Sequence, residues 1–232
     1  MSTVTSGADR VHPALPRGIR APLAAVGMLG AVFAVTLGVA FAGQATGSGF
    51  DRRVAAALRL PQTFSSPAYA VSWVVQTLAD PIPAAVLVLL LVAACLRCGW
   101  RRLAVLAVAG PMAADVIVIL TKHIVGRTIH HGSLTYPSTH TAQAAALAMV
   151  TALLITSLLG LDAAGAAAAL VLGAAATSAL VMGWALVAGS VHYATDTLAG
   201  LCVAVAVVPA AALCTDLVGD RVSTDRPVGT PT

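Results

Sequence analysis

Six stretches of this chain are long and apolar enough to cross a lipid bilayer as helices, and this limits its fold more than any other feature. A spanning helix needs about 20 mostly apolar residues. We expect spans at about 22–42, 82–97, 103–123, 140–159, 164–187 and 194–214. Because the hydrocarbon layer holds no water, backbone polar groups must be satisfied within each helix. The sequence therefore predicts an all-α polytopic membrane protein, a six-transmembrane-helix bundle.

The composition of the 232 residues supports this class. Hydrophobic residues make up 59% of the chain and charged residues 9%, whereas a soluble domain of this size needs a more polar surface. The net charge of +4 is scattered over the ends of the apolar runs, which membrane sorting explains without nucleic acid as a partner. Cys95 and Cys98 have no second pair to complete a zinc site, so small packing residues are the favoured interpretation.

One membrane domain is predicted over 22–215, and the polar segments 1–21 and 216–232 are expected to be disordered. Between the first two spans, residues 50–60 predict a short extracytoplasmic amphipathic helix on the membrane surface, with a solvated connector as the alternative. Residues 66–79 are apolar but short. They predict a partial or interfacial helix, or the first half of the second span.

The basic residues predict the orientation, because cytoplasmic loops carry an excess of Lys and Arg. With both termini inside, eight basic residues are cytoplasmic: Arg10, Arg17, Arg20, Arg97, Arg101, Arg102, Arg221 and Arg226. Five are then extracytoplasmic: Arg52, Arg53, Arg59, Lys122 and Arg127. The Arg-, Ala- and Val-rich composition suggests a bacterial source, so we expect a multi-pass protein of the bacterial inner (plasma) membrane.

His192 opens the last span and Asp196 follows four residues later, so in a helix the two side chains share a face. A carboxylate bonded to one ring nitrogen fixes the tautomer and leaves the other nitrogen free as a nucleophile. The helix start also favours an incoming anion. Taken alone, such a pair is more often a satisfied polar pair at the end of a span.

His140 opens the fourth span directly after Ser138 and Thr139, which can cap that helix. Free N–H groups and hydroxyls at a helix start can hold phosphate oxygens, and a histidine beside them can act as a general acid. Lys122, the single lysine, and Arg127 supply positive charge at the same predicted membrane face. The alternatives are a plain helix cap and cations that extend to the interface.

Together these residues resemble the motifs of the type 2 phosphatidic acid phosphatase family, the membrane branch of a superfamily that includes vanadium haloperoxidases. The family motifs are Lys-x6-Arg-Pro, Pro-Ser-Gly-His and Ser-Arg-x5-His-x3-Asp. Lys122 matches the first, Pro137-Ser138-Thr139-His140 matches the second with Thr for Gly, and His192 with Asp196 matches the end of the third. The resemblance covers roughly residues 80–210.

The resemblance implies a six-helix membrane phosphatase without a metal or other cofactor. It implies a phosphohistidine intermediate on His192, with His140 as the acid and Asp196 as the partner of His192. The expected substrate is a lipid phosphate or diphosphate in contact with membrane lipids: a polyprenyl phosphate or diphosphate, phosphatidic acid or phosphatidylglycerol phosphate. Phosphate oxygens would be held by Lys122, Arg127, Ser138 and Thr139.

Both family arginines are absent from their expected positions, which hold Ile129 and Leu186. Arg127 lies two positions before the first of them, and His130 or His131 is a possible replacement for the missing charge. Otherwise the substrate differs, or activity is weak or absent. The alternative function is a catalytically impaired relative that binds phospholipid headgroups or assists an envelope-lipid pathway.

Asp115 lies within the third predicted span, two turns before Lys122. An acid at membrane depth indicates function by default, and a polar partner inside the bundle is the favoured interpretation. A small transporter is a further alternative, although no inverted repeat or pair of broken helices is visible to support it.

Overall fold

The computed structural model describes residues 12–130, 132–161 and 163–224. Its helices are α1 (Arg17–Ala40), α2 (Gly49–Ala57), α3 (Pro67–Thr77), α4 (Pro81–Arg97), α5 (Arg101–Val125), α6 (Thr139–Leu158), α7 (Ala164–Ala188) and α8 (Ala194–Thr224). A short antiparallel hairpin, β1 (Thr128–Ile129) and β2 (Ser133–Leu134), lies between α5 and α6. The predicted all-α class is confirmed.

Five of these helices, α1 and α5 to α8, are each long and apolar enough to cross a membrane. α3 and α4 pass the same test as a pair, with a bend of 62° between them. The break precedes Pro81, because the residue before a proline disfavours helical backbone and Pro81 then fits the first position of α4. With the bent pair counted as one span, the described chain has the six predicted spans.

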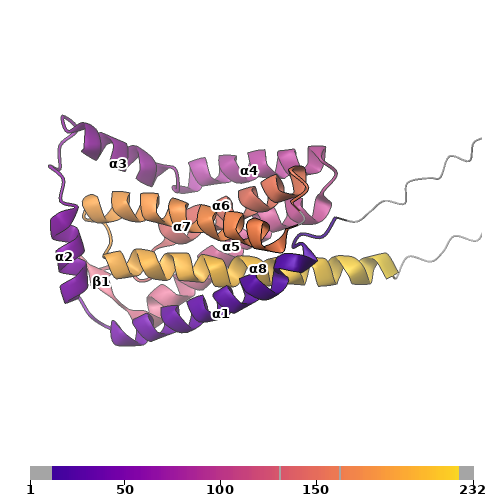
Figure 1. Ribbon diagram of the computed structural model, residues 1–232. Coiled ribbons are helices and arrows are strands. Elements are labelled where there is room, and N and C mark those ends of the chain that lie inside the picture. Colours follow the sequence, from indigo (N-terminus) through magenta and orange to yellow (C-terminus); the bar gives the residue numbers. More distant parts are fainter. Residues whose placement is uncertain (1–11, 131, 162, 225–232) are drawn as a thin grey trace, which may run out of the picture.

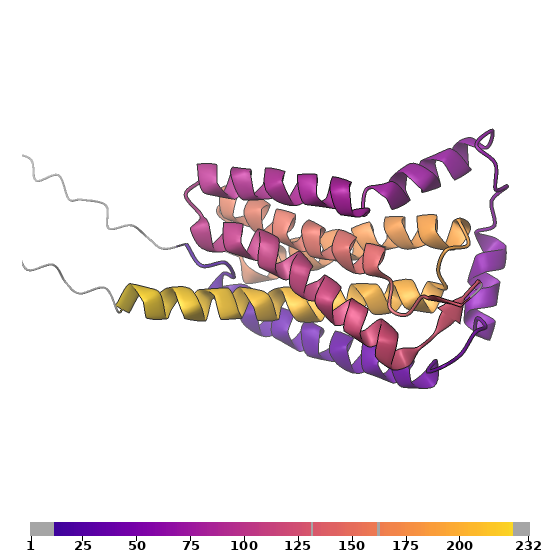
Figure 2. The same cartoon turned by 180° about the vertical axis from the view of Figure 1, so that it is seen from behind.

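α8 lies inside the bundle and packs against α1, α5, α6 and α7 (Figures 1 and 2). α1 packs closely against α8 because α1 carries glycines at the contact. A Cβ atom on Gly27 would lie 2.8 Å from the carbonyl oxygen of Val205, and one on Gly30 would lie 3.1 Å from that of Cys202. Glycine at such crossings lets helix backbones approach each other in a membrane.

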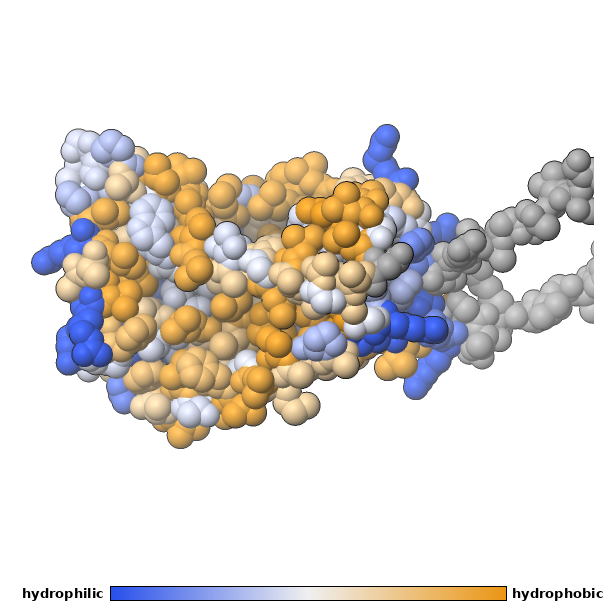
Figure 3. Space-filling model, in the orientation of Figure 1, coloured by the Kyte–Doolittle hydropathy of each residue, from blue (hydrophilic) through white to orange (hydrophobic). Residues whose placement is uncertain are grey.

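The bundle has two polar ends. The site end carries α2, the hairpin, and the starts of α6 and α8 (Figure 1, left). The terminal end carries the start of α1 and the end of α8 (Figure 1, right). Hydrophilic residues gather at these two ends, whereas apolar residues dominate the surface between them in the view of Figure 3. Such an apolar band is the surface that a bilayer-spanning bundle requires.

Ordered structure extends past the predicted limits of the membrane domain at both ends. The buried carboxylate of Asp216 on α8 accepts a hydrogen bond from the backbone N–H of Ala14 at 2.7 Å and from Nη2 of Arg20 at 2.6 Å. These bonds fix the segment before α1 against α8. They correct the expectation of disorder for residues 12–21 and 216–224; the rest of both predicted tails lies outside the described residues.

Candidate active site

The end of α5, the loop after it, and the starts of α6 and α8 meet at the site end (Figure 1). α5 ends where Gly126 adopts a left-handed conformation with φ of 64°. α6 begins after Ser138, whose hydroxyl caps its first turn. The loop from α7 to α8 then brings in His192. The structure therefore places Lys122, His140 and His192 at the same end of the bundle, as the sequence predicted.

His192 reaches its predicted carboxylate partner through a hydroxyl. Its Nδ1 atom lies 2.8 Å from Oγ1 of Thr135, but 3.6 Å from Oδ2 of Asp196. Oγ1 of Thr135 donates to the same Oδ2 atom at 2.6 Å. That oxygen also accepts from the backbone N–H of Tyr193 at 3.0 Å. The expected direct bond between His192 and Asp196 is thus replaced by a bridge through Thr135.

The environment of His192 favours the neutral imidazole. Burial lowers the pKa of His192 below its ordinary value of 6.5, and the nearby Asp196 opposes this only in part. The charges of Lys122 and His140 add to the lowering. A neutral imidazole keeps a lone pair on one nitrogen, as a nucleophile must.

Lys122 lies beside the residue that bridges to His192. Its Nζ atom donates to the carbonyl oxygens of Leu134 and Thr135, at 3.1 Å and 3.4 Å. The side chain is half-buried at the end of α5. Its ammonium group is therefore fixed close to His192, where it can attract an anion. Direct phosphate binding by Lys122 stays a prediction.

His140 lies at the start of α6 and contacts the break between α3 and α4. Its Nε2 atom is 3.3 Å from Oδ1 of Asp80, and both side chains are partly exposed. The buried Ser138 hydroxyl is engaged in capping, and the backbone N–H of Ser138 donates to the carbonyl oxygen of Asp196 at 3.0 Å. Thr139 is half-buried. Phosphate contacts by Ser138 and Thr139 also stay predictions.

The start of α6 packs tightly on α8 just after Asp196. A Cβ atom on Gly200 would lie 2.6 Å from the carbonyl oxygen of Ser138. Glycine at this position therefore lets the two helix starts approach each other and fixes the spacing between His140 and His192.

Arg127 is fully buried and holds two protein carboxylates. Its Nη1 atom donates to Oδ1 of Asp196 at 2.6 Å, and its Nη2 atom donates to Oδ2 of Asp51 at 2.8 Å. The guanidinium carbon lies 4.1 Å from the centre of the Phe41 ring and 4.3 Å from that of the Tyr193 ring. These are distances typical of cation–π contacts. The predicted phosphate contact of Arg127 would require it to leave these partners.

Asp51 ties α2 to this cluster. It closes a capping box with Ser48 at the start of α2, and it accepts from the backbone N–H of Thr195 at 2.9 Å. Burial raises the pKa of Asp51, but the hydrogen bonds from Thr195, Arg127 and Ser48 outweigh burial and hold the pKa below its ordinary value. Asp51 is therefore ionised beside Arg127. α2 itself is confirmed as a helix, and it lies across the site end (Figure 2).

The possible replacements for the family arginines lie in or next to the hairpin. His130 is exposed, and its Nε2 atom lies 2.8 Å from the carbonyl oxygen of Ser190, in the loop between α7 and α8. His131 lies outside the described residues. At the positions of the family arginines, Ile129 is part of β1, and Leu186 is buried in α7. His130 thus contacts the loop that carries His192. Its compensation for the family arginines stays a prediction.

Asp115 has the polar partner that the sequence suggested. With the Gln143 amide turned so that its nitrogen faces Asp115, that nitrogen lies 3.2 Å from both carboxylate oxygens. Gln143 follows His140 by three residues on α6. The pair therefore lies one turn inside the bundle from His140.

Sequence reasoning missed several residues that contact the predicted ones, among them Thr135, Asp51 and Asp80. The Ser48-x-x-Asp51 spacing could have indicated a helix start at α2, and Asp80 precedes a proline, which is a helix-start signal. Neither signal names the distant partner. Thr135 carries no local signal beyond its position two residues before Pro137.

The family model of the PAP2 superfamily matches residues 115–219. This range begins within α5, ends within α8, and contains all of the predicted catalytic residues. No curated protein and no solved structure matches the chain. Residues 115–219 are therefore similar to the PAP2 superfamily, and a phosphatase-type activity is the general function that this match supports.

Proposed function

We propose that the protein is an integral membrane lipid phosphate phosphatase. It hydrolyses a lipid phosphate or diphosphate at the extracytoplasmic face of the membrane. The observation that carries the proposal is a buried His192 whose Nδ1 atom is engaged by Thr135, the residue whose carbonyl oxygen accepts a hydrogen bond from Lys122, at the same end of the bundle as His140. A nucleophile, a cation and a proton donor are the groups that metal-free phosphate transfer through histidine needs.

The proposed reaction has two steps. In the first, the lone pair on Nε2 of His192 attacks phosphorus, the bond from phosphorus to the lipid oxygen breaks, and protonated His140 gives that oxygen a proton. In the second, His140 takes a proton from water, the water oxygen bonds to phosphorus, and the N–P bond breaks. Inorganic phosphate leaves and His192 is restored. Lys122 offsets the negative charge of the transferred group in both steps.

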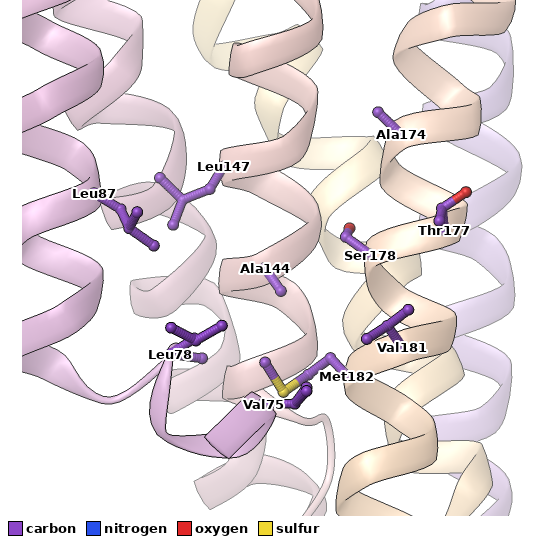
Figure 4. Close-up of a pocket in the computed structure, with 11 residues that line it drawn as sticks. Val75, Leu78, Leu87, Ala144, Leu147, Ala174, Thr177, Ser178, Val181 and Met182 are labelled. Atoms are coloured by element: carbon purple, nitrogen blue, oxygen red, sulfur yellow. The ribbon is translucent and has the colours of Figure 1, made fainter. Parts of the chain in front are cut away.

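An apolar groove beside His140 supports a lipid substrate. The groove has a volume of about 430 Å³ and lies between α3, α4, α6 and α7 (Figure 4). Its lining includes Ala144, one turn after His140 on α6, and the two residues directly before Asp80, Leu78 and Ala79. A hydrocarbon tail in this groove would bring its phosphate toward the contact between His140 and Asp80.

The test is release of inorganic phosphate by the purified protein in lipid vesicles. The panel contains a polyprenyl diphosphate, phosphatidic acid and phosphatidylglycerol phosphate, each with and without a chelator. We expect turnover of at least one lipid that persists with the chelator, and its loss in His192→Ala. The variant should keep the elution profile and thermal unfolding of the native protein. Turnover retained by folded His192→Ala would remove His192 as the nucleophile.

A second function, headgroup binding without turnover, is favoured by one observation. The family's two arginine positions hold apolar residues, and Arg127 is engaged by Asp51 and Asp196. If no lipid of the panel is hydrolysed but vesicles containing one of them bind saturably, this second function replaces the first.

A further inference from the structure

Thr135 makes hydrogen bonds through each of its polar groups, and each group contacts a different part of the site. Its backbone N–H donates to the carbonyl oxygen of Arg127 at 2.9 Å, and its carbonyl oxygen accepts from Lys122 at 3.4 Å. Its hydroxyl contacts both His192 and Asp196. The residue is buried, with 1% of its surface exposed. A hydroxyl in this setting depends on its protein partners for its hydrogen bonds.

The position of the hydroxyl proton follows from counting donors. A threonine hydroxyl has one proton to donate and two lone pairs to accept with. The carboxylate of Asp196, which also accepts from Arg127 and from the backbone of Tyr193, can only accept. The proton of Thr135 therefore points to Asp196, and a lone pair of the same oxygen faces Nδ1 of His192. Nδ1 must then carry hydrogen, which leaves the lone pair of the ring on Nε2.

We propose that Thr135 is a positioning residue that fixes the tautomer of His192 and links its ring to Asp196. Without the hydroxyl, Nδ1 and the carboxylate are 3.6 Å apart, which is too far for a direct hydrogen bond. This inference rests on the proposed function, because it assumes that Nε2 of His192 attacks phosphorus. When the ring becomes positive during that attack, Nδ1–H donates to a hydroxyl that is itself polarised by a carboxylate.

The kinetic test compares two substitutions of Thr135. Thr135→Ser keeps the hydroxyl, and Thr135→Val keeps the shape but removes it. We expect Thr135→Ser to stay within a few-fold of the native kcat. Thr135→Val should lose about tenfold to a hundredfold in kcat, the range seen when a metal-binding histidine loses its outer hydrogen-bond partner, with little change in KM. Thr156→Val, which removes a buried hydroxyl near the far end of α6, is the matched control and should leave kcat unchanged.

A second measurement decides the inference even if the native protein hydrolyses none of the lipids. The protein is labelled with ¹⁵N-histidine, and the His192 signals are assigned by their loss in His192→Ala. We expect hydrogen on Nδ1 in the native protein and in Thr135→Ser, and a shift toward the other tautomer in Thr135→Val. An unprotonated Nδ1 in the native protein, or an unchanged tautomer in folded Thr135→Val, would overturn the role of Thr135. Failure of the lipid assay alone would overturn only the proposed function.

Discussion

The guanidinium of Arg127 contacts the carboxylates of Asp51 and Asp196, and all three side chains are buried. Removing one partner from such a cluster leaves a charge without compensation, which typically costs about 3–5 kcal/mol of stability. The same contacts fix the carboxylate of Asp196, and through Thr135 they orient His192. The geometry of the nucleophile thus depends on a residue whose own ion pairs are with protein carboxylates.

The lowered pKa of His192 predicts the pH dependence of the reaction. An ordinary histidine is half protonated at about pH 6.5, but His192 stays neutral there because burial disfavours its charged form. Activity that needs neutral His192 should therefore persist as the pH falls through 6.5, and it should be lost only at lower pH. The measurement is kcat/KM from pH 4.5 to 8, with the ionisation of the substrate phosphate titrated separately and divided out. An acid limb at or above 6.5 would contradict the assigned environment.

The predictable part of the site is local in sequence, and the missed part is not. His192 and Asp196 are four residues apart, so they lie close together along the chain even though His192 precedes the first residue of α8. Asp51 and Arg127 are 76 residues apart, and Thr135 and His192 are 57 apart. Contacts at such separations depend on how loops fold over the end of the bundle, and one sequence carries no direct sign of that.

The break between α3 and α4 borders one side of the apolar groove near His140. The bend of 62° turns α3 away from the line of α4 at the site end (Figure 1). α6 and α7 form the other side of the groove, whose lining is mostly apolar. At the scale of elements, a proline that interrupts a span therefore creates a place for a hydrocarbon tail beside the proposed acid.

A bulky substitution in the lining of the groove should make the enzyme discriminate between substrates by the length of the hydrocarbon tail. Ala174 and Ala176 lie on different faces of α7, and only Ala174 lines this groove (Figure 4). Ala174→Trp should exclude the end of a long tail. Burial of one methylene contributes about 0.8 kcal/mol, and a tenfold change corresponds to about 1.4 kcal/mol. Exclusion of two methylenes should therefore raise KM roughly tenfold for a long-tailed substrate.

The controls for this variant are internal. A short-tailed substrate should be turned over by Ala174→Trp as by the native protein, and Ala176→Trp should leave both substrates unaffected. An equal loss on short and long tails, in a folded protein, would show that the groove does not hold the tail.

The long helices were predictable because the length of each apolar run, and the turn residues that end it, can be read from the local sequence. The partial helix before the second span was also expected, since residues 66–79 are too short to cross a bilayer. The role of α2 was not predictable in this way. Its amphipathic pattern suggested contact with lipid, but its single acid, Asp51, is buried against Arg127, a partner that periodicity does not reveal.

For the molecule as a whole, the proposed orientation predicts which end reagents can reach. Cys98 is exposed and lies between α4 and α5 at the terminal end. With that end in the cytoplasm, a membrane-impermeant maleimide should not label Cys98 in intact spheroplasts, and it should do so after permeabilisation. Cys98→Ala identifies the signal.

The complementary variant is Thr46→Cys in the Cys98→Ala background. Thr46 is exposed between α1 and α2 at the site end, so this cysteine should react in intact spheroplasts. The reverse pattern of labelling would indicate the opposite orientation in the membrane and would place the candidate active site on the cytoplasmic face.

The long contact between α1 and α8 has a consequence for biogenesis. α1 is synthesised before α8, so it contacts its main neighbour only when α8 has been made, and Ala14 bonds to Asp216 across 202 residues of chain. Until then, the glycine face of α1 must be covered by lipid or by an insertion factor. Final assembly of this bundle therefore waits until α8 has been made. A chain truncated before α8 should leave α1 without its main packing partner. Quality-control proteases can recognise such an incompletely packed protein.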